Sequence, residues 1–357
     1  MKLSVACNFD ETLIDGLKGY PVYELYGKVT EDFVGGGRPS FFLPPINKKR
    51  VESFVAKTHA NGIAFNYLLN ALCMSNLEYT KQGQREIRKI LDWLTEIKCD
   101  SVTVTNLYLL RFIKKNYPHF KVRVSAINLV DSARKARFWE NEGADCIVLG
   151  GNTIAREFGI LKSIRDGVKC DLSIVVNNAC RKDCPLYSLH AASISHNSQK
   201  QSGQKQTPPL DYIMLSCINC KLSDPVNFIR AEWIRPEDLH HYEAIGINNF
   251  KIVERNTPTP DLIRRVHAYS NRHYDGNLFD LILPFNYPIE SYEPKTEYTL
   301  GRLRALKYFF KPFQFEISKF FQLARLSKKA NLLHPREGKS PLYIENRALD
   351  GFIDKCI

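Results

Sequence analysis

Four of the ten cysteines in this 357-residue chain stand in two close pairs. Three residues separate Cys180 from Cys184, and two separate Cys217 from Cys220. Each pair follows an apolar, strand-like run, so both pairs are expected at the same end of a sheet. Four thiolates can saturate one tetrahedral metal ion or bind the four irons of a cubane cluster. The spacing therefore predicts one shared metal site on these four residues.

The four cysteines alone do not identify the metal, because they suit structural zinc and iron–sulfur clusters equally. Zinc usually organises a small ribbon that is unstable without metal, whereas this chain is 44% hydrophobic and can bury a full core. An iron–sulfur cluster is therefore favoured over zinc. His190 and His196 lie close enough in sequence to act as ligands or proton donors, or simply as surface histidines.

The N-terminus lacks an apolar run of the signal-peptide type, and no stretch of about 18 apolar residues predicts a membrane span. A cytoplasmic location is therefore expected. Because thiols stay reduced in that compartment, the cysteines are not expected to form a disulfide framework.

Nine strand-like runs alternate with helical patterns along the chain. The runs cover 3–7, 22–27, 62–69, 101–106, 121–128, 145–151, 172–178, 212–217 and 250–255, and helical periodicity covers 48–60, 84–97, 107–116, 131–142 and 154–166. Apolar strands alternating with helices predict a parallel sheet covered on both faces, which a doubly wound sheet or a closed barrel would satisfy. Eight or nine units in about 255 residues favour a (β/α)8-like TIM barrel, complete or distorted.

Two regions break this alternation. The barrel is assigned to 1–275 with a cysteine-bearing insert at 180–220, and a helical, basic extension packed on it is assigned to 276–357. Within the insert, the polar stretch 190–209 predicts a mobile loop. Residues 301–340 hold ten of the Lys and Arg residues that give the chain its net charge of +12, interleaved with seven Phe and Tyr. This pattern suits RNA binding, or equally an amphipathic helix that docks its Phe face on the barrel.

In a TIM barrel the active site lies at the carboxyl ends of the strands. Polar side chains at or just beyond the predicted strand ends give Asn66, Asn70 and Arg255 as catalytic candidates, and Tyr26 and Asn106 as substrate-binding candidates. His190, near the cysteines in sequence, is a further catalytic candidate, and Arg38 is a further substrate-binding candidate. Arg38 lies in GGGRPS (35–40), where glycine amides could hold a phosphate or carboxylate with help from Arg255. The alternative is a flexible loop over the barrel mouth.

Two segments carry a specific family resemblance. NNACRKDCPLYSLHAASISH (177–196) resembles the Asn-x-x-Cys-x-x-x-Cys-Pro…His element of the collagenase-like peptidase family U32, and EWIRPEDLHHYEAIGINNFKIVER (232–255) resembles its Trp-Ile-Arg-Pro-Glu-Asp-Leu element. The similarity covers about residues 1–270, and IENRALDGFIDKC (344–356) resembles the closing segment of the family. Ala155 and Glu254 stand where the family pattern has Asn and Gly.

The resemblance implies a barrel with a [4Fe–4S] cluster, for which Cys180, Cys184, Cys217 and Cys220 match the ligands. Members studied as hydroxylation factors act without oxygen on RNA bases or ubiquinone precursors, although the cysteine spacing here differs from theirs. The function expected is an oxygen-independent hydroxylase or related redox enzyme acting on RNA, a peptide or a small aromatic molecule, with room for a partner subunit.

Two alternative functions stay open. The family label suggests a metal-independent peptidase, yet the sequence lacks a Gly-x-Ser-x-Gly elbow and a His-Glu-x-x-His helix. The basic region suggests an RNA-binding accessory protein, in which the four cysteines would hold structural zinc.

Overall fold

The computed structural model describes residues 1–40, 43–150, 152–200, 212–282 and 343–355. Eight parallel strands close into a barrel in which each strand pairs with the next along the chain and the last pairs with the first. The strands are β1 (Lys2–Ala6), β2 (Val22–Gly27), β3 (Ala64–Leu69), β4 (Ser101–Val104), β5 (Lys121–Val124), β6 (Cys146–Leu149), β7 (Asp171–Val175) and β8 (Asn249–Ile252). The TIM barrel is confirmed, and the doubly wound sheet is excluded.

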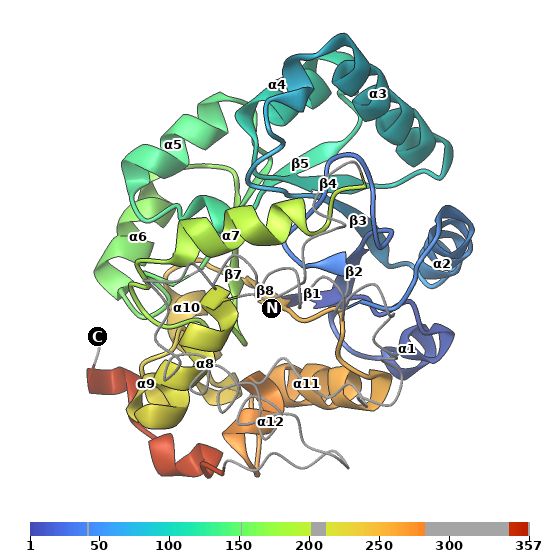
Figure 1. The fold of residues 1–357 in the computed structure, drawn as a ribbon. Helices are drawn as coiled ribbons and strands as arrows, with labels where there is room; N and C mark the ends of the chain where they lie inside the picture. Colours follow the sequence, from blue (N-terminus) through green and yellow to red (C-terminus); the bar gives the residue numbers. More distant parts are fainter. Residues whose placement is uncertain (41–42, 151, 201–211, 283–342, 356–357) are drawn as a thin grey trace, which may run out of the picture.

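Helices follow most strands and ring the barrel (Figure 1). They are α1 (Glu11–Gly16), α2 (Lys48–Ala60), α3 (Lys81–Glu96), α4 (Leu107–Asn116), α5 (Ala133–Asn141), α6 (Phe158–Gly167) and α11 (Thr259–Asn271). The five predicted helices are confirmed to within about four residues at each end. Asn47, Thr80 and Asn106 fix three of the starts, because each side chain accepts a hydrogen bond from a first-turn amide.

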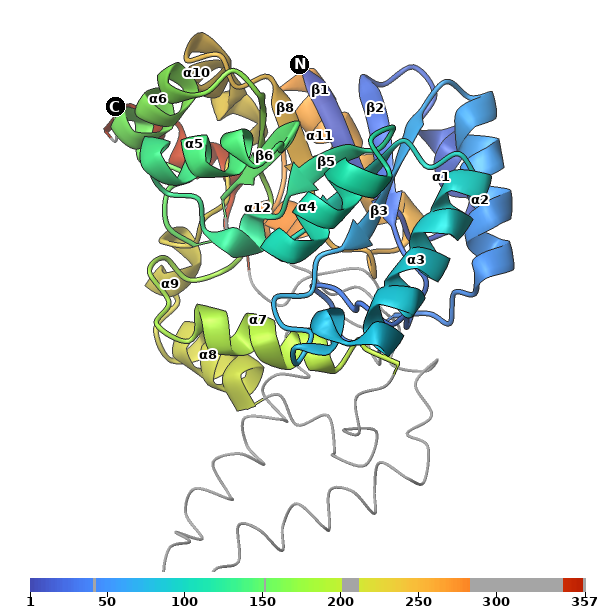
Figure 2. The ribbon, with the colours of Figure 1, turned by 90° about the horizontal axis from the view of Figure 1, so that it is seen from above.

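A long insert joins β7 to β8 and contains α7 (Tyr187–His196), α8 (Tyr212–Ser223), α9 (Val226–Ile229) and α10 (Leu239–Ala244). Figure 2 shows α7 and α8 together beyond one end of the barrel, opposite the end where the chain begins. Because β1 starts at the N-terminus, α7 and α8 cap the carboxyl ends of the strands. The insert therefore covers the end where a barrel enzyme places its active site.

Two predictions within the insert are wrong. The run 212–217 is the first half of α8 rather than a strand, because a short apolar run has no periodicity that separates a helix from a buried strand. Residues 190–196 belong to α7 rather than to a mobile loop, and the following Ser198 and Gln199 are buried against the glycine segment. Residues 201–209 of the predicted loop lie outside the described residues.

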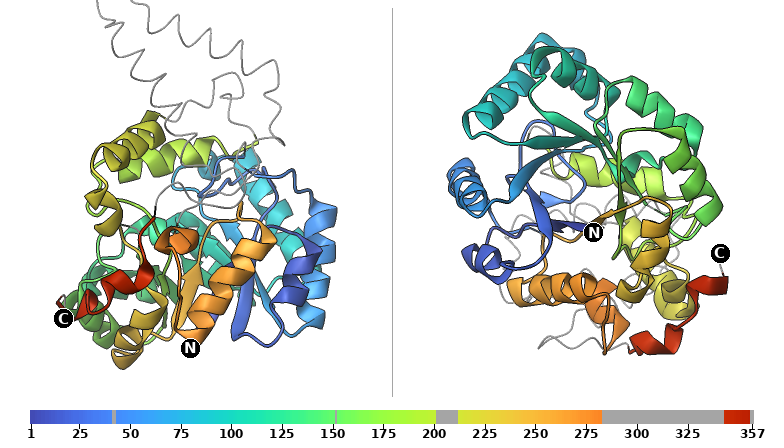
Figure 3. Two further views of the ribbon diagram at one scale, coloured as in Figure 1. Left: turned by 90° about the horizontal axis from the view of Figure 1, so that it is seen from below. Right: turned by 180° about the vertical axis from the view of Figure 1, so that it is seen from behind.

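The described ends of the C-terminal region pack beside the insert. Figure 3 shows α12 (Leu278–Ile282) and the short turns Asn346–Leu349 and Ile353–Lys355 near α9 and α11. Leu278 and Phe279 share an apolar cluster with Phe228 and Trp233, against which Phe352 packs. The basic segment 301–340 lies outside the described residues, so its role and the domain boundary at 275 stay predictions. Among the described helices, none is long and apolar enough to cross a membrane.

Candidate active site at the barrel mouth

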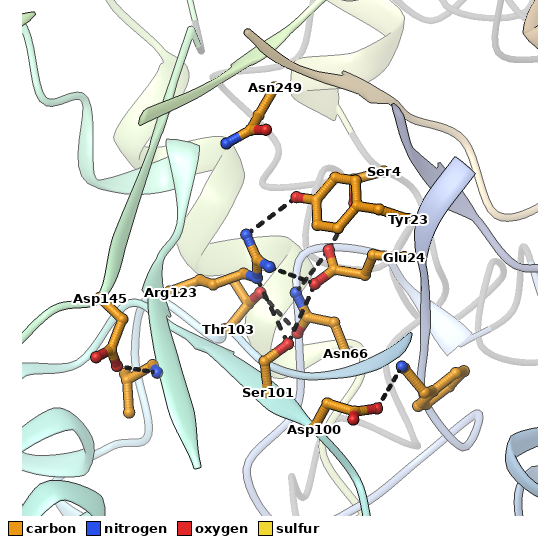
Figure 4. Close-up of polar contacts among 12 residues, drawn as sticks. Ser4, Tyr23, Glu24, Asn66, Asp100, Ser101, Thr103, Arg123, Asp145 and Asn249 are labelled. Atoms are coloured by element: carbon orange, nitrogen blue, oxygen red, sulfur yellow. Dashed lines mark hydrogen bonds and ion pairs between the residues drawn. The ribbon is translucent and has the colours of Figure 1, made fainter. Parts of the chain in front are cut away.

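The interior of the barrel is polar and centres on Glu24 of β2 (Figure 4). Its carboxylate accepts hydrogen bonds from Ser4 at 2.7 Å and Ser101 at 3.2 Å, and forms an ion pair with Arg123 at 2.6 Å. Asn66 donates to Glu24 and accepts a hydrogen bond from Thr103 at 2.9 Å. Asn66 is thus fully buried in mid-strand, below the strand ends where it was predicted, and both polar atoms of its side chain have protein partners.

Tyr26 and Lys251 lie above this network. The Tyr26 hydroxyl donates to the carbonyl of Ile252 at 3.0 Å, and the Lys251 ammonium lies 4.1 Å from the centre of the Tyr26 ring. Burial lowers the pKa of Lys251 to about 8, although nearby Glu24 opposes the shift. Tyr26 is only 4% exposed, so it forms the floor of the mouth rather than an accessible binding surface.

The glycine segment is held firmly rather than lying loosely over the mouth. The amides of Gly35, Gly36 and Gly37 donate to Asp32 at 2.7 Å, Ser198 at 2.7 Å and Asn70 at 3.2 Å. The predicted use of these amides as an anion cradle is therefore wrong, because all three already have acceptors from the protein. Asn70 does lie at the end of β3 as predicted, where its side chain anchors Gly37.

Gly36 has a steric reason to be glycine. A Cβ there would lie 3.1 Å from Oδ1 of Asn70 and 3.2 Å from Cδ of Lys28. The Lys28 ammonium forms a buried ion pair with Asp32 at 2.8 Å, and the Tyr67 hydroxyl donates to the same carboxylate at 2.9 Å. The close approach thus seats the glycine segment directly on a buried ion pair.

Arg38 follows the glycine segment, Arg255 follows β8, and the two lie close enough for the charge of Arg38 to act on Arg255. Arg38 forms an ion pair with Glu254, so its charge is already compensated. Glu254 has a φ of 88°, in the region that favours glycine, which accounts for the glycine of the family pattern at this position. Arg255 is 6% exposed, and burial together with nearby Arg38 lowers its pKa to about 10.

The two cysteine pairs lie in neighbouring parts of the cap. Cys180 follows β7, Cys217 lies on α8, and the Cys217 thiol is near enough to contribute to the pKa of Cys180, which burial raises to about 11. The Lys221 ammonium ties α8 to this loop by donating to the carbonyl of Ala179. In the described ranges, no three His, Cys, Asp or Glu side chains are grouped closely enough to hold a metal ion.

Comparison with known proteins places this barrel in a family. The model of peptidase family U32 matches residues 44–272, which is more than half of the chain. The chain belongs to peptidase family U32. An uncharacterized protease of Methanocaldococcus jannaschii is 35% identical over 261 residues, covering 73% of this chain and 75% of the relative. A solved U32 peptidase structure covers 71% of this chain and 93% of its own, with a TM-score of 0.53 and 20% identity, and so supports the shared fold.

Two further candidate residues in this U32 barrel are Asn106, at the start of α4, and His190, on α7 in the cap. Asn106 caps α4 and donates to Glu78 at 2.8 Å, and it lines a surface groove of about 670 Å³ with Tyr79 and Phe112. A helix start selects for Asn on its own account, so the cap alone explains this residue, and its substrate role stays a prediction. His190 is half-buried on α7 in the cap.

Prediction from sequence missed several charged residues of the U32 mouth. Lys28 and Asp32 follow β2, and Glu254 stands beside Arg255, which had been selected. Glu24 and Lys251 lie inside strands whose other residues are mostly apolar. A charged residue within such a strand was the available signal, because burying it requires a partner or a function.

Proposed function

We propose that this U32 protein is an oxygen-independent hydroxylase, or a related redox enzyme, that carries a [4Fe–4S] cluster on Cys180, Cys184, Cys217 and Cys220. The observation that carries the proposal is that Cys180 and Cys217, which come from separate segments of the insert, lie near one another in the cap over the barrel mouth. Four half-buried free thiols are a donor set typical of such a cluster. The residue type fits the cluster, and the two pairs lie in neighbouring segments, but within the described part of the chain no three of the thiols are grouped closely enough to hold a metal.

The protein residues would supply binding and exclusion of water. When bound, the cluster would provide one-electron transfer beside the mouth. Replacing a C–H bond by a C–OH bond with oxygen from water releases two protons and two electrons, so a one-electron carrier or partner subunit must accept the electrons in turn. Helices α7 and α8 cover the carboxyl ends of the strands and would limit access of bulk water to the reacting carbon.

Metal analysis of cysteine variants tests the proposal. The full chain, purified without oxygen, should contain about four iron and four sulfide ions per molecule and a brown chromophore. Cys180→Ala and Cys217→Ala should each lose most of the iron, because each removes one ligand. Cys170→Ala is the matched control, since this half-buried thiol precedes β7 at the opposite end of the barrel. Stoichiometric zinc without iron in the parent protein would refute the cluster.

A peptidase is the second candidate, because both the family and the relative from Methanocaldococcus jannaschii carry a protease name. A peptidase would cleave peptides after complete removal of iron and zinc, and in the Cys180→Ala variant. Activity that survives both treatments would favour hydrolysis, whereas activity that disappears with iron and in air supports the redox proposal.

A further inference from the structure

The charges around the barrel mouth are not balanced among the described residues. Three ion pairs are complete: Lys28 with Asp32, Arg38 with Glu254, and Arg123 with Glu24. Lys251 and Arg255 are buried as well, at 8% and 6% exposed. The carboxylate of Glu24 faces Lys251 without forming an ion pair with it, whereas no described carboxylate faces Arg255. Apart from the Tyr26 ring over Lys251, no described group bonds to them. A buried cation without a counter-charge is costly, so this arrangement favours a ligand that supplies one.

Arg255 faces a small cavity at the ends of three adjacent strands. The cavity is lined by Arg255 after β8, by Cys7 and Asn8 after β1, and by Lys28 after β2. Leu43, Pro44 and Ile46 form an apolar wall. Its volume of ≈ 10 Å³ holds about one water-sized group, so only a compact end of a ligand would enter.

We propose that Arg255 binds a carboxylate group of the substrate at this cavity, with one carboxylate oxygen inside it. A guanidinium donates charge-assisted hydrogen bonds to a carboxylate, and a single carboxylate oxygen is small enough for such a space. Lys251 adds a second positive charge close to Arg255. The proposal rests on the proposed function only in taking the mouth as the active site, and it narrows the substrate to a molecule that carries a carboxylate.

Ligand-dependent stability tests the carboxylate site without an activity assay. Sodium malonate should raise the thermal unfolding midpoint of the full chain above its value in sodium chloride of equal ionic strength, because a ligand that binds only the folded state stabilises it. Arg255→Met should weaken malonate binding at least about tenfold in calorimetry, and Arg255→Lys should retain part of it as a point charge. Arg111→Met, which removes the same charge from exposed α4, should bind malonate like the parent protein.

A folding readout separates a binding role from a structural one. Because Arg255 has no described bonding partner, Arg255→Met should unfold without ligand at the same temperature as the parent protein or higher. A lower midpoint combined with unchanged malonate binding would overturn the proposal. Inorganic phosphate that stabilises the parent protein as well as malonate does would overturn the assignment to a carboxylate.

Iron analysis of the same samples keeps the two proposals apart. Malonate binding by a protein that contains no iron would support the carboxylate site while refuting the cluster. Iron at the expected content, with no malonate binding that depends on Arg255, would refute the carboxylate site and leave the cluster standing.

Discussion

Lys251 is a buried amine, and keeping it charged at neutral pH lowers the stability of the folded state. Glu24 of β2 faces it with a negative charge, while Arg123 of β5 and Arg255 oppose its protonation and Cys146 of β6 lies close by. The folded pKa of about 8 lies below the ordinary value of 10.5. The unfolded chain therefore binds more protons than the folded one between these two values, and stability rises with pH across that window.

Replacing Lys251 with Met should consequently stabilise the protein at neutral pH. The gain is expected to approach about 3 kcal/mol in free energy of unfolding below pH 8, from 1.36 kcal/mol per pKa unit, and to shrink to nothing by about pH 10.5. Urea unfolding of both proteins from pH 7 to pH 10.5 measures this difference. A gain that does not depend on pH would show that Lys251 is not the titrating group.

The residues of the mouth also show what sequence reasoning could and could not reach. Asn70 and Arg255 were selected because they follow strand ends, where a barrel gathers polar groups, and Arg38 because it follows a run of glycines. Asn66 was misplaced because the prediction did not resolve which face of β3 it occupied or how far down the strand it lay. The pairing of Arg38 with Glu254 depends on two distant loops meeting, which no local pattern encodes.

Helices and strands were predictable wherever the chain repeats a simple period. Eight of the nine predicted runs are barrel strands because their apolar residues face the ring of helices, and the neighbouring helices carry clear apolar stripes. Helix α8 escaped prediction because its first half is almost wholly apolar and is positioned by tertiary contacts such as that of Lys221 with Ala179.

Two glycines in helices should respond to alanine in opposite ways. Gly83 lies in the first turn of α3, where a Cβ would fall 1.8 Å from the carbonyl oxygen of Leu77, so Gly83→Ala should destabilise by about 1–3 kcal/mol. Gly159 in α6 has nothing within 4 Å of its added Cβ, so Gly159→Ala should stabilise by about 0.5–1 kcal/mol. Thermal unfolding of both variants measures the contrast. Stabilisation of both would show that the turn at Leu77 shifts to accommodate the added Cβ at little cost in free energy.

At the scale of the whole molecule, the segment 232–255 contacts the closing segment 344–356, and both segments resemble the family pattern. Arg235, a few residues after α9, forms an ion pair with Asp350, and Glu237 accepts a hydrogen bond from Asn346 at 2.9 Å. The ring of Phe352 lies 6.2 Å from that of Trp233 in a stacked arrangement. The closing segment therefore packs against the part of the insert around Trp233 and Arg235. These contacts join the cysteine-bearing insert to the described C-terminal residues.

The central claim is that one cluster joins the two cysteine pairs above the mouth of the barrel. X-ray absorption at the iron edge of the anaerobically purified full chain tests it most directly. The account predicts a first shell of sulfur alone around iron, with iron neighbours in the second shell. Iron surrounded by nitrogen and oxygen, or a protein whose only bound metal is zinc in a four-sulfur shell, would contradict it.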